Sequence, residues 1–401
     1  MKRRKDQQQW AFGDGEGYAD FLQKALTDTA DRDVSAYFDA ESPWYHVGVV
    51  HYLLRATIVL HRHAKTKHVK EWLVFSQQCL DVACATGPTL ADSQGAGLPL
   101  PKWAEISRTS ITSALRNNHP SIDDVRLVTT TEARLHARSF HSRNTIQVSA
   151  LMREYLRTFN LCIWNTQFGI TENLRKLNID IELTRFVRVF IEHVITLYRN
   201  ASPSSMAVIR AYSPEAFHWT QITTGIQLNF ILAHEYAHIV LHGNTVGRDP
   251  QQEADADAFA ATLLLGEPFR GAFGPTAGDI WMALDWLFGF IELERIAGAA
   301  LNDYPIDWEQ LSLEHRRNAL RALIAQAGIT GHDGNLAVIG SALLRDLKAE
   351  LRTSHEQGSF HEYVTDWLDV FGLASRPHLP TAESLNKRRK FHDKYDYARR
   401  R

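Results

Sequence analysis

The chain has 401 residues, with 44 basic against 46 acidic side chains and 44% hydrophobic residues. This is an ordinary globular composition, and its near balance of charge excludes a protein that binds polyanions over its whole surface. The three cysteines, Cys79, Cys84 and Cys162, lack Cys-x-x-Cys spacing, which excludes a disulfide framework and a cysteine-ligated zinc site.

Targeting and membrane signals are missing from the sequence pattern. The basic N-terminus is not followed by an apolar h-region, and no stretch reaches the roughly 18 uncharged apolar residues that a spanning helix needs. The nearest candidate, Ile280–Ile291, is interrupted by Asp285. Basic clusters occur only near the two ends, where we interpret them as solvated tails. We therefore expect a soluble, cytoplasmic protein with no membrane partner and no nucleic-acid partner.

Helical periodicity dominates the first half of the chain. It predicts helices over Gly17–Thr27, Tyr45–His61, Lys70–Ala85, Val148–Cys162 and Glu182–Tyr198. Two short segments with strand character, Val125–Thr130 and Thr145–Ser149, predict a small sheet. The Gly- and Pro-rich stretch Gly87–Pro101 predicts a loop or linker between elements.

These elements predict a predominantly helical α+β fold. A chain of this length also exceeds one ordinary core. We expect a helical N-terminal region over 1–120, a core with the small sheet over 121–330, and a helical C-terminal region with a basic tail over 331–401.

The segment Thr223–Gly243 predicts a helix, because apolar residues recur at helical spacing and a glycine ends it. It contains His234, Glu235 and His238 in the order His-Glu-x-x-His. Residues four apart lie on one helix face one turn apart, so both imidazoles can bind one metal ion. The carboxylate of Glu235 can then reach a water on that metal and act as its general base.

A second helix follows after a short loop. Asp249 is a suitable N-cap, Pro250 suits the first helical position, and the helix is expected to run to Leu265. Glu253 and Asp257, four residues apart, share one face of it. One of these carboxylates can supply a third ligand while the other orients a ligand imidazole. Three protein ligands and an open fourth position are typical of catalytic zinc.

The pattern HEYAHIVLHG followed by EADADAFAATLLL resembles the gluzincin zinc metallopeptidases. It is closest in style to the HtpX-like peptidases, with His-Glu-x-x-His and Glu-x-x-x-Asp, and to the ImmA/IrrE-like peptidases. The clear match covers about 234–265. The resemblance implies a zincin-like core in which His234, His238 and Glu253 bind Zn²⁺, Glu235 is the catalytic base, and Asp257 supports a ligand histidine.

Several assignments stay open at this point. Asp257 or Asp255 could replace Glu253 as the third ligand, because the spacing from His238 is short for the wider clan. Related peptidases stabilise the oxyanion with a residue C-terminal to the zinc helices, where Tyr304 and His315 are candidates. Thr145–Ser149 is the expected edge strand for holding an extended peptide, with an ordinary buried strand as the alternative.

The sequence therefore predicts a zinc metallopeptidase that acts on a protein or peptide substrate, with a dedicated partner in a regulatory or defence role as one version. The alternatives are a catalytically inactive zinc-binding interaction protein and a zinc hydrolase of a non-peptide amide. The presence of Glu235 argues against the first alternative, because a structural metal site needs no base there.

Overall fold

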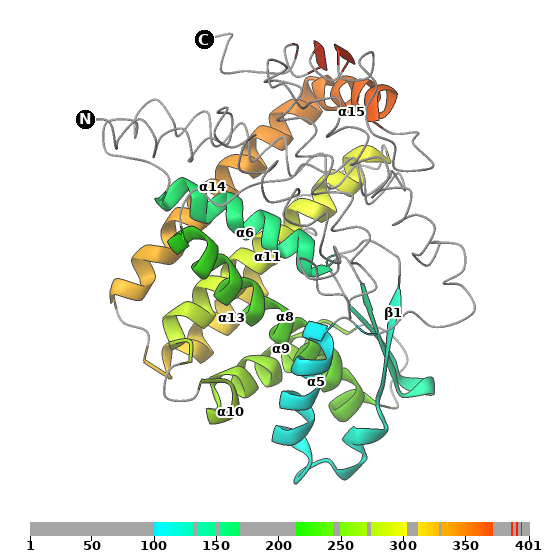
Figure 1. Cartoon of the computed structure of the whole chain (residues 1–401), viewed down its shortest axis with the longest axis vertical. Coiled ribbons are helices and arrows are strands. Elements are labelled where there is room, and N and C mark those ends of the chain that lie inside the picture. The colour runs from blue at the N-terminus through cyan, green and yellow to red at the C-terminus, as the bar shows by residue number, and fades with distance from the viewer. Residues whose placement is uncertain are drawn as a thin grey trace, which may run out of the picture. The chain divides into compact units, whose positions relative to one another are not determined.

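The computed structural model describes part of the chain, namely residues 100, 102–130, 135, 137–149, 152–168, 214–243, 249–270, 274–302, 312–328, 331–371, 386–387, 390–391 and 394. These residues form mostly helices with one three-stranded sheet (Figure 1). This confirms the predominantly helical α+β class. The predicted helices before residue 100 and over 182–198 lie outside the described residues, as does most of the loop 87–101.

The chain divides into two compact units. One unit comprises residues 95–163 and 218–353, and its described residues include the predicted metal ligands. It therefore combines parts of all three predicted regions. Among the helices in the described part of the chain, none has the length and apolar character needed to cross a bilayer.

The sheet is small and mixed. Strands β1 (Arg126–Thr130) and β3 (Thr145–Ser149) pair in parallel, and β2 (Arg138–Phe140) pairs antiparallel with β3. The order β1-β3-β2 places β3 in the centre of the sheet. The expectation that Thr145–Ser149 is an edge strand is therefore wrong, and β1 and β2 are the edge strands of this sheet. Ile146 and Val148, which lie on one face of β3, are both fully buried.

Helix α5 (Lys102–Leu115) precedes the sheet and α6 (Met152–Phe168) follows it. The predicted helix Val148–Cys162 thus begins too early, because Val148 and Ser149 belong to β3. The metal-site motif lies on α8 (Pro214–His242), which starts nine residues before the predicted Thr223 and ends at the predicted place.

Helix α9 (Pro250–Leu265) has the predicted bounds. The Asp249 carboxylate accepts a hydrogen bond from the backbone N–H of Gln251 at 2.9 Å, and Pro250 occupies the first turn. These local contacts satisfy a free N–H group of the first turn and set where the helix begins. The short α10 (Glu267–Arg270) follows directly.

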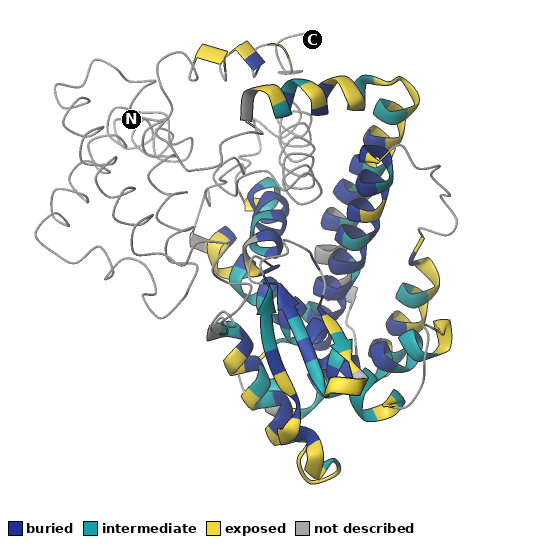
Figure 2. Cartoon of the chain, turned by 90° about the vertical axis from the view of Figure 1, so that its right-hand side faces the viewer, coloured by how far each residue is buried: buried dark blue, intermediate teal, exposed yellow. Residues whose placement is uncertain are grey.

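Helix α11 (Ala277–Leu301) is the central element of this unit, and its residues are buried on nearly every side. It begins with a capping box in which Thr276 and Asp279 exchange hydrogen bonds. Aromatic contacts join it to two other helices: Phe288 meets Phe230 of α8, and Phe290 meets Phe159 of α6. Figure 2 shows the buried core helices in dark blue.

Two further helices complete the unit, α13 (Glu314–Ala325) and the portion of α14 (Gly331–Glu356) up to residue 353. Gly340 of α14 lies against the ring of Trp286, where a Cβ atom would come within 2.0 Å of that ring. Only glycine therefore allows this close approach of α14 to α11.

The described residues of the other unit include α15 (Ser359–Phe371). Its Trp367 is fully buried, Tyr363 packs edge-on against Phe391, and Lys394 lies 3.1 Å from Glu362.

Candidate metal centre

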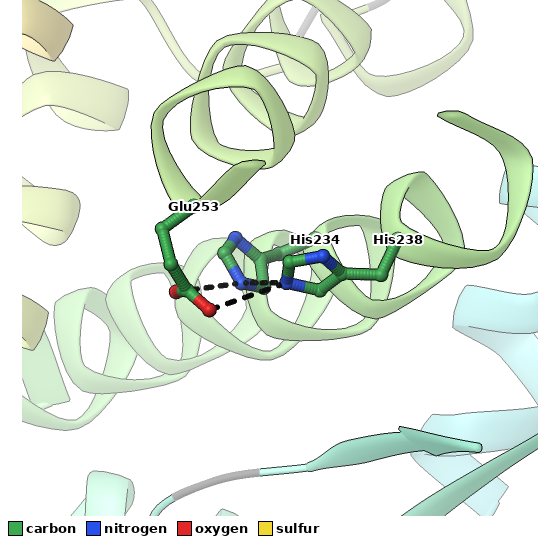
Figure 3. A group of neighbouring side chains, drawn as sticks. All are labelled: His234, His238 and Glu253. Carbon is green, nitrogen blue, oxygen red and sulfur yellow. Dashed lines mark hydrogen bonds and ion pairs between the residues drawn. The ribbon is translucent and has the colours of Figure 1, made fainter. Parts of the chain in front are cut away.

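Three side chains that could ligate a metal converge between α8 and α9. His234 and His238 project from successive turns of α8, and Glu253 reaches toward both of them from α9 (Figure 3). The two Nε2 atoms are 3.0 Å apart, and the Glu253 carboxylate oxygens lie 3.5 Å from Nε2 of His234 and 3.6 Å from that of His238. One donor atom from each of the three residues can therefore reach a single metal ion placed between them.

The spacing of these donors suits a tetrahedral ion. Ligands about 2.0–2.2 Å from a tetrahedral zinc are separated from each other by about 3.3–3.6 Å. The three observed separations lie close to that range. Each of the three side chains is at least three-quarters buried, so a bound ion would be largely shielded from bulk water.

Asp257 lies one turn after Glu253 on α9 and is almost completely buried. Its Oδ1 atom is 2.9 Å from Nδ1 of His234, although the oxygen lies off the axis of the ring N–H bond. A proton held on Nδ1 leaves the lone pair of Nε2 directed at the metal position. Asp255, one of the alternatives for the third ligand, instead accepts a hydrogen bond from the Gln251 amide at 2.8 Å.

Arg316 is the site residue that sequence reasoning missed. Its Nε and Nη2 atoms donate to the two oxygens of Asp257 at 2.6 and 2.7 Å, and its Nη1 atom lies 3.1 Å from Glu253. The guanidinium also lies over the Phe288 ring. This planar fork holds both carboxylates of α9 in fixed orientations, which a lysine could not do.

Arg316 lies in the same segment, 303–317, from which the prediction selected Tyr304 and His315. An arginine next to a selected candidate was therefore the signal that could have found it. His315 is exposed on α13, while Tyr304 lies outside the described residues. His242, one turn beyond His238, is not part of the ligand cluster.

Glu235 lies one residue from the first ligand, and its surroundings differ from those of Glu253. Burial raises the pKa of the Glu235 carboxyl, while His234 and hydrogen bonds with the hydroxyl and backbone of Ser139 lower it, and the net shift is upward. Burial also opposes ionisation of Glu253, but His234 and Arg316 overcome it and lower the pKa of Glu253 to about 2. Two carboxyl groups of the same cluster thus have pKa values shifted in opposite directions, as at many acid–base sites.

The charges of the cluster leave room for a divalent cation. Glu235, Glu253 and Asp257 oppose the single guanidinium of Arg316, which leaves two negative charges in excess when all three carboxyls are ionised. In the metal-free protein, protons offset part of this excess. Burial opposes protonation of His234, but the Asp257 and Glu253 carboxylates outweigh it and raise the pKa of His234 to about 9 from its ordinary 6.5.

We expect the apparent metal affinity to rise with pH between about 7 and 9. A ligand imidazole must be neutral, so at pH 7 a metal has to displace the proton that His234 carries below its pKa of about 9. The expected slope is about tenfold per pH unit, levelling off above pH 9. Competition titrations with a chromophoric chelator would measure it. In Asp257→Asn the proton is held less tightly and the slope should flatten near neutral pH, whereas a pH-independent affinity in the wild type would contradict the assignment.

In comparisons with known proteins, no family model, no curated protein and no solved structure matches the chain. The roles of the site residues therefore rest on their geometry alone.

Proposed function

We propose that this protein is a zinc-dependent peptidase that hydrolyses peptide bonds. The observation that carries the proposal is the convergence of His234, His238 and Glu253 on one point, with Glu235 beside them. Two imidazoles and one carboxylate form an open, three-ligand set of the catalytic type, which leaves a fourth position for water or substrate.

The residues present fit a divalent ion in spacing and in charge. A bound zinc would supply a Lewis acid that polarises the substrate carbonyl and lowers the pKa of water at the site. His234, His238 and Glu253 would hold the ion. Asp257 would keep the proton of His234 on Nδ1, and Arg316 would offset part of the negative charge of the two α9 carboxylates.

Glu235 is the proposed general base. The pKa of its carboxyl group is raised above that of an exposed glutamate and so lies nearer to neutral pH. The same group can therefore accept a proton from the attacking water and return it to the leaving amine. The contact with Ser139 fixes the direction of the carboxyl group. Because Ser139 belongs to β2 and Glu235 to α8, the sheet and α8 contact each other at the proposed general base.

The position of β2 favours a peptide over a non-peptide amide as substrate. This strand pairs with β3 along one side and has no second strand neighbour among the described residues. The edge strand of a sheet can hold an extended peptide through main-chain hydrogen bonds. Ser139 of this same strand contacts Glu235, so a peptide bound along β2 would pass close to the base.

The first test is the metal content of the purified chain. We expect about one zinc per chain in the wild type and loss of that zinc in His238→Ala and in Glu253→Ala. Each variant has a matched control on the same helix: His242→Ala for the first and Asp255→Ala for the second. Both controls should retain zinc, because neither side chain belongs to the ligand cluster.

Absence of zinc from the wild type, even after zinc is supplied, would overturn the metal centre and with it the peptidase. Zinc binding without cleavage of any peptide in a mixed-sequence library would favour an inactive zinc-binding interaction protein, and cleavage of small amides alone would favour a non-peptide hydrolase. A cytoplasmic location and a dedicated protein partner stay predictions from the sequence.

A further inference from the structure

A second cluster of charged side chains joins α11, α13 and α14. Its centre is Glu292 of α11, whose side chain is 1% exposed. One carboxylate oxygen accepts a hydrogen bond from the backbone N–H of Leu313 at 2.6 Å, and the other accepts one from Lys348 at 2.8 Å. Arg317 lies 3.5 Å away. None of these residues contributes to the proposed chemistry directly.

Glu292 holds the beginning of α13. Leu313 is the residue immediately before this helix, and no side chain of α13 itself caps the first turn. The buried apolar residues within the helix, Leu320 and Ile324, lie in its C-terminal half. At the start of the helix, Leu313 is itself buried and the Ser312 hydroxyl accepts a hydrogen bond from the N–H of Glu314 at 3.3 Å. Glu292 adds the hydrogen bond from the N–H of Leu313 and the contact with Arg317.

The two adjacent arginines of α13 face in different directions, since successive helix residues are separated by about 100°. Arg317 turns toward α11, where it also lies 3.5 Å from Asp285. The absence of a side chain at Gly289 leaves room for it, because a Cβ there would come within 3.1 Å of the guanidinium. Arg316 turns toward α9 and binds Asp257 and Glu253.

We propose that Glu292 is a positioning residue for the metal centre, which holds the first turn of α13 so that the fork of Arg316 meets Asp257 and Glu253. This inference rests on the proposed metal site. The contacts of Arg316 measure 2.6–3.1 Å, so a small displacement of α13 would break the fork geometry. Burying charged groups costs more than burying apolar ones of the same volume, which agrees with a role for this cluster in geometry.

The test measures zinc affinity and the visible spectrum of the Co²⁺-substituted protein for Glu292→Gln. This change removes the charge that faces Arg317 and Lys348 and alters no proposed ligand. We expect affinity to fall about tenfold or more, together with a changed Co²⁺ spectrum that reports altered ligand geometry. The control is Asn160→Leu, which disrupts a buried polar network with Thr224 and Gln227 that does not involve α13. The control should be destabilised yet bind zinc as the wild type does.

A double-mutant cycle separates positioning from general destabilisation. If Glu292 acts through Arg316, then Glu292→Gln should cause no further loss of zinc affinity in an Arg316→Lys background. Additive losses, or wild-type affinity and spectrum in Glu292→Gln, would overturn the inference while leaving the metal centre in place. A wild type that binds no zinc would overturn both. Should Glu292→Gln not fold, Glu292→Asp keeps the charge but withdraws the carboxylate from Leu313, and the same outcomes apply.

Discussion

A Glu235→Gln variant is expected to keep its zinc and to lose peptide hydrolysis by about a thousandfold. Glutamine has nearly the same shape and can still accept a hydrogen bond from Ser139, but it cannot take a proton from water. A positioned general base typically contributes about 10²–10⁴-fold to the rate, and at this site the same group is proposed to act in both proton transfers. Glu235 is not one of the three ligands, so metal content should not change.

The measurement is the rate of cleavage of a mixed peptide library, followed by mass spectrometry, with zinc content determined on the same samples. Asp255→Asn is the matched control, since it neutralises a carboxylate of α9 that is bound to Gln251 and lies outside the ligand cluster. Undiminished cleavage by Glu235→Gln would mean that another group is the base.

An Arg316→Met variant is expected to lose both stability and metal affinity. Removing one partner of a buried ion pair leaves the other charge uncompensated, at a cost of about 3–5 kcal/mol. Here the charge left behind is Asp257, whose side chain is only 3% exposed. Protonated His234, 2.9 Å away, still compensates part of it in the metal-free protein, so this cost is the upper limit. Because Asp257 and Glu253 also lose the group that orients them, zinc affinity should fall about 10–100-fold.

Chemical denaturation of the metal-free protein would give the change in unfolding free energy, and a chelator competition would give the affinity. Arg316→Lys is the informative companion, because it keeps the positive charge but cannot bind Asp257 through two parallel hydrogen bonds. It should recover part of the stability and little of the affinity. Arg321→Met, also on α13 and in contact with the Trp281 ring, changes an arginine away from the site. Equal effects of Arg321→Met and Arg316→Met on affinity would contradict the role given to Arg316.

Helix bounds were predictable where the signals are local. The Asp249 cap and the proline after it lie next to the start of α9, and the predicted helix has the observed ends. The start of α8 was missed because this helix is buried on several sides, so its apolar periodicity is weak. Its Thr224 and Gln227 are buried polar residues satisfied by Asn160 of α6, a partner more than sixty residues away that no local pattern indicates.

The candidate ligands could be selected from the sequence because the residues of each pair lie four apart in one helix. His234 and His238 share a face through helix geometry alone, and the same rule pairs Glu253 with Asp257. The choice of Glu253 over Asp255 could not be made from spacing, since it depends on how α9 is rotated about its axis beside α8. In the structure that rotation directs Glu253 toward the imidazoles and Asp255 toward Gln251.

By itself the sequence determined the helical α+β class, the His-Glu-x-x-His helix and the capped helix that follows, because each depends on residues close together in the chain. Only the tertiary structure decided which strand lies at the edge of the sheet and which of three adjacent residues on α13 faces the metal ligands. Strand order depends on pairing between segments, and the choice of Arg316 over His315 and Arg317 depends on the rotation of α13 as set by its contacts with α9 and α11. Both are long-range packing outcomes, for which neighbouring residues carry no signal.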